Sequence, residues 1–464
     1  MRKTGQALKA GLRALILGGA AWALLAGPGA AQMGGLGGGL GGLGGGLGSG
    51  LGRGLGGLGA PGLPTGLGPA PGLGGLGGSG YVPGGLGVGD LGEGQSPTSL
   101  LDLRRARLEG LIHANRKTLE ADRHGDPVRR GEILAGPLSA DVLAKARAAG
   151  FRVAGVQTDP ALGLSVTTLI APRGKSVEAA RAELQALSPD TDFDLNPIYE
   201  PAGRGLDPAP GGATPGQPLD GAIVGMIDGG VGASPVFSHA HIEQRGFAPG
   251  GPRATGHGTA VASLIVGEAG AFHGAAPGRT LLAADIYGGQ EAAGSAQAVV
   301  AALDWLVSRR VKVINMSLVG PPNALLARAV AAAEARGVLI VAAVGNDGPA
   351  APAPYPASYS GVIAVTAVDA HNRALPEAGR PSHLDFAAPG ADLAAAAPGK
   401  GFVVVRGTSF AAPLVSARLS LAPDEGGAAV AEVAREAVPG QGPVGRGVVC
   451  QTCRVDPRLV HAGH

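Results

Sequence analysis

The feature that most constrains the fold is a series of short, almost wholly apolar segments in the second half of the chain. They alternate with longer segments of helical periodicity, a pattern typical of a parallel sheet covered by helices on both faces. The apolar segments are residues 222–227, 280–286, 311–316, 338–344 and 362–367, and the helical ones include 292–309 and 324–336. We therefore predict a doubly wound α/β domain over residues 221–440, large enough to bury its own core.

Two polar side chains in this region stand where an active site would need them. In an open parallel sheet, functional groups collect beyond the carboxyl ends of the strands. Asp228 directly follows the first apolar segment, and His257 opens a helix of small residues in the sequence GHGT. Each has an ordinary alternative when considered alone, because an Asp often forms a turn and a His beside glycines is often structural.

Two further polar residues follow the same logic. Asn346 comes directly after the apolar segment 338–344, and Ser409 lies in the sequence GTSFAAP at the start of a helix. Their alternatives are a turn Asn and a helix N-cap Ser. A helix N-terminus also presents free N–H groups and a positive dipole to a developing anion.

The four motifs together, in this order and with these flanks, resemble those of the subtilisin-like serine peptidases, the subtilases. The resemblance spans about residues 221–421, less than half of the chain. It implies that Ser409 attacks a peptide carbonyl, that His257 takes and returns the proton, and that Asp228 holds the imidazole. It also implies an oxyanion hole formed by the Asn346 side chain and the Ser409 backbone N–H.

The same resemblance implies where a substrate binds. Ser317, Leu318, Val319 and Gly320 follow the segment 311–316, where the family pairs the substrate as an added strand. Gly345 is expected to line the pocket for the residue before the cleaved bond.

The sequence departs from the family pattern at one position beside the acid. The family usually has Ser or Thr between the Asp and the following Gly, whereas this chain has Gly229, and the loss of that hydroxyl is expected to loosen the acid. No acidic loop has the ligand spacing of a calcium site, so neither a metal nor any other cofactor is predicted.

The N-terminal third has two segments of unusual composition. Residues 1–31 have the basic, apolar and small-residue order of a secretory signal peptide, with an apolar run shorter than the roughly 20 residues of a membrane-spanning helix. An uncleaved anchor is the alternative; otherwise the mature protein starts near Gln32 and has no stable membrane insertion. Residues 32–95 are a Gly/Leu-rich low-complexity segment, about half glycine, which favours a flexible tether over self-association or surface attachment.

Residues 96–200 have ordinary composition and predict a small α+β domain. Helical spacing over 99–123 is followed by the order β-α-β-β-α-β, typical of a ferredoxin-like split βαβ sandwich. The resemblance implies that this domain is a propeptide, which acts as an intramolecular inhibitor and is cut off within the Pro/Gly-rich linker 201–220, between about Tyr199 and Asp220. A retained regulatory domain is the alternative, and the helical segment 99–123 has no place in the propeptide scheme.

The C-terminal tail, residues 441–464, holds the two cysteines of the chain. Cys450 and Cys453 give only half of a zinc site and lack a thioredoxin-like context, so a local disulfide is expected in an exported protein. The formal net charge of +2 gives no reason to expect a nucleic-acid partner.

The sequence therefore predicts a periplasmic or extracellular serine endopeptidase, made as a self-processing zymogen, that acts on proteins or peptides. Two other functions remain open. One is a catalytically silent subtilase fold that binds peptides, and the other is a surface or matrix protein whose main functional part is the Gly/Leu-rich segment.

Overall fold

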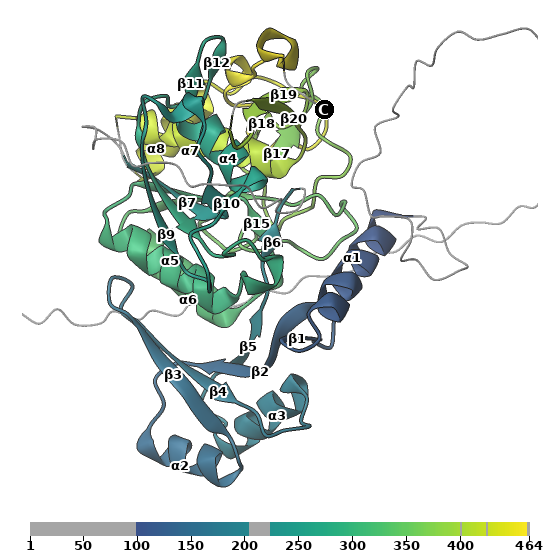
Figure 1. The fold of residues 1–464 in the computed structure, drawn as a ribbon, viewed down its shortest axis with the longest axis vertical. Helices are drawn as coiled ribbons and strands as arrows, with labels where there is room; N and C mark the ends of the chain where they lie inside the picture. Colours follow the sequence, from purple (N-terminus) through teal and green to yellow (C-terminus); the bar gives the residue numbers. More distant parts are fainter. Residues whose placement is uncertain (1–98, 204–222, 400, 424–425, 462–464) are drawn as a thin grey trace, which may run out of the picture. The chain divides into compact units, whose positions relative to one another are not determined.

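The computed structural model describes residues 99–203, 223–399, 401–423 and 426–461 (Figure 1). The predicted signal peptide, the Gly/Leu-rich segment and almost all of the predicted linker lie outside these residues. No helix in the described part of the chain is long and apolar enough to cross a membrane.

The predicted catalytic domain, called the catalytic fold below, is built on a seven-stranded parallel sheet in the order β18-β17-β16-β14-β7-β13-β9. Its strands are β7 (Ile223–Asp228), β9 (His241–Gly246), β13 (Thr280–Asp285), β14 (Val313–Met316), β16 (Leu339–Ala343), β17 (Ile363–Val368) and β18 (Phe386–Pro389). The five apolar segments of the sequence form the five central strands. The two edge strands were not predicted, and β9 reads HIEQRG because an edge strand need not be apolar on both faces.

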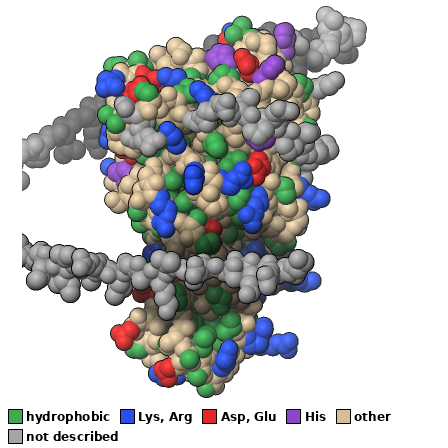
Figure 2. Space-filling model, turned by 90° about the vertical axis from the view of Figure 1, so that its left-hand side faces the viewer, with side chains coloured by type: hydrophobic (Ala, Val, Ile, Leu, Met, Phe, Trp, Pro, Cys, Tyr) green, Lys and Arg blue, Asp and Glu red, His purple; other side chains and the backbone are tan. Residues whose placement is uncertain are grey.

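Helices cover both faces of this sheet, as Figure 1 shows, with α4, α7 and α8 on one side and α5 and α6 on the other. Their bounds are α4 Gly256–Val266, α5 Ala296–Ser308, α6 Ala324–Glu334, α7 Thr408–Leu421 and α8 Gly426–Arg435. One face of the molecule, seen in Figure 2, carries both basic and acidic side chains among hydrophobic and other residues. The predicted doubly wound α/β fold is confirmed.

The residues before the linker form a second sheet with two helices. Four antiparallel strands run in the order β3-β4-β2-β5, which is the order of a ferredoxin-like split βαβ sandwich, and the short β1 extends the β2 edge. The elements are β1 (Leu119–Ala121), β2 (Pro127–Ala135), α2 (Ala140–Ala148), β3 (Arg152–Asp159), β4 (Leu164–Ile170), α3 (Val177–Leu187) and β5 (Phe193–Pro197). Ser139 and Ser176 cap the two helices by accepting hydrogen bonds from backbone N–H groups.

The helix before this sheet, α1 (Leu100–Ala114), is shorter than the helical pattern over 99–123. Its end is set by Asn115, whose side-chain amide donates a hydrogen bond to the carbonyl of Leu111 at 2.9 Å. Such a local side-chain bond satisfies a terminal carbonyl and competes with further helix formation. The chain then turns into β1, so the second half of the predicted helix is wrong.

Several short elements complete the described chain. The two-stranded pairs are β6 (Glu200–Pro201) with β15 (Leu318–Val319), β8 (Gly230–Val231) with β10 (Ala254–Thr255), β11 (Glu268–Ala269) with β12 (Phe272–His273), and β19 (Leu393–Ala396) with β20 (Phe402–Val405). Single 3₁₀ turns span Pro235–Phe237, Glu291–Ala293, Gln451–Cys453 and Pro457–Val460.

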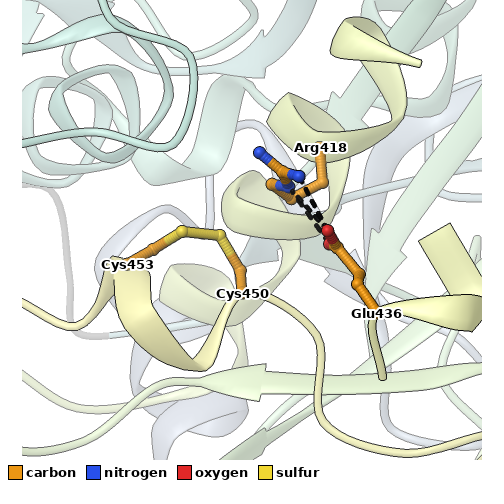
Figure 3. Close-up of a disulfide and its surroundings, with 4 residues drawn as sticks. All are labelled: Arg418, Glu436, Cys450 and Cys453. Carbon is orange, nitrogen blue, oxygen red and sulfur yellow. Dashed lines mark hydrogen bonds and ion pairs between the residues drawn. A yellow bond between two sulfur atoms is a disulfide. The ribbon is translucent and has the colours of Figure 1, made fainter. Parts of the chain in front are cut away.

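The C-terminal tail contains a local disulfide, and its backbone bonds to the sheet, where Val449 N–H donates to the Ala387 carbonyl at 2.7 Å. Cys450 and Cys453 are joined, as Figure 3 shows. In the same view, Arg418 of α7 forms an ion pair of 2.7 Å with Glu436, just after α8. The expected local disulfide is therefore present.

Candidate active site

The acid and the imidazole lie together at the end of the sheet. Asp228 is the last residue of β7, and His257 is the second residue of α4, whose N-cap Thr255 accepts a hydrogen bond from Gly258 N–H at 3.0 Å. The His257 Nδ1 atom is 2.9 Å from Asp228 Oδ1, and both side chains are 1% exposed. The other imidazole nitrogen, Nε2, has no hydrogen-bond partner within the described residues and so remains available to a further group.

The serine lies at the start of the longest helix of the catalytic fold. Ser409 is the second residue of α7 and is fully buried. Its Oγ donates a long hydrogen bond of 3.4 Å to the carbonyl of Ser317, and its own carbonyl accepts a bond of 2.8 Å from Ser317 Oγ. These two contacts fix the helix start against the strand edge that follows β14.

The Asn346 side chain is oriented by the same helix start. Its Oδ1 accepts a hydrogen bond of 3.0 Å from Thr408 N–H, which leaves Nδ2 pointing away from the helix. Nδ2 donates a short hydrogen bond to the carbonyl oxygen of Ala202. An amide held this way is suited to stabilise negative charge on an oxygen at that position.

A segment of the chain itself occupies the cleft. β6 pairs antiparallel with β15, and Ala202 N–H donates to the Ser317 carbonyl at 2.9 Å. On the opposite side, Tyr199 N–H donates to the Gly294 carbonyl at 2.7 Å. The segment is thus held by backbone hydrogen bonds between β15 and the turn that ends at Gly294, a mode of peptide recognition that tolerates many sequences.

The peptide bond between Ala202 and Gly203 lies against the candidate catalytic groups. A Cβ atom added to Gly203 would stand 2.9 Å from His257 Nε2 and 3.3 Å from Ser409 Oγ. Gly203 is therefore a residue on which both groups converge, and the preceding carbonyl is the one bound by Asn346.

Two side chains of the segment are buried in the cleft. Tyr199 is completely buried, and its hydroxyl donates to the Pro321 carbonyl at 2.8 Å, so burial raises its pKa well above the usual value. Gly320 gives the ring its space, because a Cβ there would lie 2.6 Å from Tyr199 Cδ1. Glu200 is also buried and forms an ion pair with Arg107 of α1.

The residues predicted to bind substrate all lie around this segment. Leu318 and Val319 form the paired strand β15, flanked by Ser317 and Gly320. Gly345 lies beside the Val319 side chain, and both line a cavity of about 60 Å³ next to Glu200.

The departure at Gly229 has a structural explanation that the sequence did not offer. A Cβ at this position would stand 2.4 Å from Thr255 Oγ1, so the Thr255 side chain occupies the space that a residue 229 side chain would need. Gly229 N–H still donates to Asp228 Oδ1 at 2.6 Å. Asp228 Oδ1 is therefore held by the backbone and by His257, whereas the buried Oδ2 has no hydrogen-bond partner among the described residues, so the expected loosening stays a prediction.

The sequence missed four residues of this region, namely Thr255, Ala202, Gly203 and Arg107. None carries a recognisable signature, because the first three act through shape or backbone and Arg107 lies on the helix that had no assigned role. Among the described residues, no group of three or more His, Cys, Asp or Glu side chains is placed to hold a metal ion.

Comparison with known proteins agrees with this geometry. The profile of the subtilase family matches residues 220–429. Subtilisin Savinase of Lederbergia lenta is 34% identical over 222 residues, which cover 46% of this chain and 80% of that protein. The alkaline protease of Alkalihalobacillus alcalophilus is also 34% identical over 222 residues, although this chain spans only 57% of its length.

A solved structure extends the likeness in fold. Fervidolysin from Fervidobacterium pennivorans, described as a keratinolytic enzyme related to subtilisin, matches 72% of this chain and 61% of its own, with a TM-score of 0.58 and 20% identity. The chain belongs to the subtilase family and is a serine-type endopeptidase, as the motifs in residues 221–421 predicted.

Proposed function

We propose that the protein is an exported, self-processing zymogen whose catalytic residues are Asp228, His257 and Ser409, with Asn346 in the oxyanion hole. The observation that carries this proposal is the placement of the peptide between Ala202 and Gly203. Its carbonyl oxygen accepts a hydrogen bond from Asn346, and the residue after it adjoins His257 and Ser409. The chain thus supplies its own first substrate.

The proposed reaction follows from this arrangement. Ser409 Oγ attacks the carbonyl carbon of Ala202 while His257 Nε2 takes the hydroxyl proton, and the charge that develops on the oxygen is stabilised by Asn346 Nδ2 and the Ser409 N–H. His257 then returns the proton to the amide nitrogen of Gly203 as the bond breaks. Water attacks the acyl-enzyme by the same steps and releases the Ala202 carboxylate. Asp228 holds the imidazole through Nδ1 and stabilises its charged form.

The self-cleavage is therefore assigned to the bond between Ala202 and Gly203, inside the predicted window from Tyr199 to Asp220. The α+β domain that precedes it acts as the propeptide, and after the cut its new C-terminus remains paired with β15 as an inhibitor. Retention of that strand, rather than cleavage alone, delays the appearance of activity.

The substrates are proposed to be proteins or peptides in extended conformation. Backbone pairing with β15 and with Gly294 places no demand on most side chains. The side chain of Ala202, which precedes the proposed scissile bond, is a single methyl group. Export to the periplasm or the cell exterior is proposed from the signal-peptide pattern of residues 1–31.

One experiment tests the enzyme and the processing bond together. The full chain is expressed in an exporting host, labelled with a fluorophosphonate probe, and its fragments are sequenced from their N-termini. We expect a labelled fragment that begins at Gly203 and no label or cut in the Ser409→Ala chain. An intact chain that binds peptides but never takes up the probe through Ser409 would favour the catalytically silent alternative.

A further inference from the structure

The helix α1 contacts the occupied cleft, although the propeptide scheme gave it no role. Its Leu108 side chain is buried, and Leu111 packs with a small cluster of Leu119, Ile198 and Ala292. Ile198 directly precedes the strand held in the cleft, and Ala292 belongs to the 3₁₀ turn next to it. One face of α1 is thus packed against both the propeptide and the catalytic fold.

A bridging ion pair joins α1 to the strand in the cleft. Arg107 Nη1 lies 2.5 Å from Glu200 Oε2, and Arg107 Nη2 lies 2.9 Å from Asp347 Oδ1. Glu200 is the third residue before the proposed scissile bond, and Asp347 directly follows the oxyanion residue Asn346. One guanidinium therefore ties the substrate strand to the loop that binds its carbonyl.

A second arginine strengthens this connection from the same helix. Arg104 Nη2 is 2.5 Å from Asp126, and its Nε is 3.5 Å from Asp347 Oδ2. Both arginines face inward, whereas Arg105 is largely exposed and pairs with Asp102 of its own helix at 3.3 Å. Arg105 is therefore a matched control on the same helix.

The arginine is needed because Glu200 is buried near other acids. Burial raises the pKa of the Glu200 carboxyl, and Arg107 opposes this effect, whereas Asp347 and Glu291 add to it. Without Arg107, the buried carboxylate of Glu200 would lose its cationic partner, whereas Asp347 would keep its contact with Arg104. Leaving one member of a buried pair unpartnered strongly weakens the structure that holds it.

We propose that Arg107 is a positioning residue for the self-cleavage, and that α1 is a clasp holding segment Tyr199–Ala202 in the cleft through Glu200 and Asp347. This inference rests on the proposed function. Before the cut, the clasp keeps the carbonyl of Ala202 on Asn346. After the cut, the same contacts retain the product strand, so that α1 prolongs inhibition.

The test follows two events in the refolding full-length chain. Intact-mass spectrometry times the cut between Ala202 and Gly203, and fluorophosphonate labelling of Ser409 times the opening of the cleft. With Arg107→Gln, we expect the cut to slow about tenfold and the interval between cut and labelling to shorten about fivefold, because the strand is held less tightly. Arg105→Gln should change neither time by more than about twofold.

Two further variants separate a charge effect from simple misfolding. Glu200→Gln in the Arg107→Gln background removes the stranded carboxylate and should restore part of the cleavage rate, whereas a misfolded helix would not be rescued. Arg107→Lys keeps the positive charge but cannot bind both carboxylates as a guanidinium does. Its cleavage rate should therefore lie between those of the parent chain and of Arg107→Gln.

The outcomes distinguish the clasp from the proposed function. If the parent chain is cut and labelled but Arg107→Gln follows the same time course as Arg105→Gln, the clasp is wrong and the proposed function stands. Failure of the Glu200→Gln rescue would also overturn the charge bridge. If the parent chain itself is neither cut nor labelled, the proposed function fails.

Discussion

At the scale of single residues, the Thr255 side chain occupies the space that a side chain at position 229 would need. The same threonine, from β10, caps α4, which carries His257. The side chain that the family usually places directly after the acid is thus replaced in space by one from β10.

The effect on stability of placing a Ser at position 229, as in the family, should depend on the residue at position 255. Gly229→Ser alone should destabilise the fold by about 1–3 kcal/mol, because its Cβ overlaps Thr255. Adding Thr255→Gly should recover part of the lost stability, because the overlap is removed and Gly is an acceptable N-cap. Urea unfolding of the single and the double variant, both in the inactive Ser409→Ala chain, measures the two free energies of unfolding. Equal stability of Gly229→Ser and its parent would show that the two side chains do not compete.

Gly203 predicts a second effect at this scale. Gly203→Val should slow the self-cleavage about 100-fold, because the added side chain displaces the peptide from His257 and Ser409. Gly155→Val is the control, since a Cβ there has open space. Gel or mass analysis of the refolding chain gives the rates. A Gly203→Val chain cut at the same bond and at the parent rate would contradict the assignment of this bond.

At the scale of elements, α6 carries a titrating group at its end. Burial raises the pKa of Glu334 to about 7, and its Oε1 has no hydrogen-bond partner among the described residues. Because this pKa is above that of the unfolded chain, the folded state binds more protons between about pH 4.5 and 7. The contribution of Glu334 to stability is therefore present at low pH and is lost as the pH rises to 7.

We expect Glu334→Gln to stabilise the fold more at pH 8 than at pH 5, by about 1–2 kcal/mol in the free energy of unfolding. This difference is smaller than the whole pKa shift of Glu334 would give, because the carboxyl group is only half-buried. Thermal and urea unfolding of Ser409→Ala chains at both pH values measure this. Glu243 is the opposite case, since its bond to Arg309 lowers its pKa and its contribution is lost as the pH falls. A Glu334→Gln chain with the pH profile of its parent would disprove the prediction.

At the scale of the whole molecule, the propeptide-like domain and the catalytic fold share specific hydrogen bonds. Asp194 of β5 accepts one from the backbone N–H of Ala324 at 2.7 Å, at the start of α6. Asn196 accepts one from Gln297 N–H at 3.3 Å near the start of α5. The sheet therefore supplies acceptors to two helix N-termini, where unpaired N–H groups and positive dipoles favour them.

Asp194→Ala is expected to weaken this association by about 1–2 kcal/mol, because it removes a charged hydrogen-bond acceptor from the N-terminus of α6 while the N-cap Asn323 remains. After self-cleavage, the N-terminal fragment should dissociate sooner, and labelling of Ser409 should follow the cut sooner. Asp190→Ala, at an exposed position of the same domain, is the control. Native mass spectrometry of the cut complex measures dissociation, and equal lifetimes for the two variants would rule out a role of the Asp194 hydrogen bond.

The sequence predicted the parts of this molecule that local patterns determine. The central strands, the four motifs at Asp228, His257, Asn346 and Ser409, and the propeptide-like order all follow from apolar runs and short signatures. The role of Ala202 could not be predicted, because a strand that pairs through its backbone needs no particular side chain. The role of Arg107 could not be predicted, because its partner Asp347 lies 240 positions away in the sequence. Long-range pairings of this kind leave no periodicity to detect.

The strand held between β15 and Gly294 belongs to the same polypeptide as Ser409, and this has a kinetic consequence. The proposed self-cleavage is unimolecular, so its half-time should be the same in dilute and in concentrated protein. Removal of the severed domain by a second, already active molecule depends on collisions between molecules. The rate of the first cut should therefore be independent of protein concentration, whereas the later release of activity should accelerate as active enzyme accumulates. In concentrated protein most molecules should become active at nearly the same time, and in dilute protein the cut molecules should stay inhibited for longer.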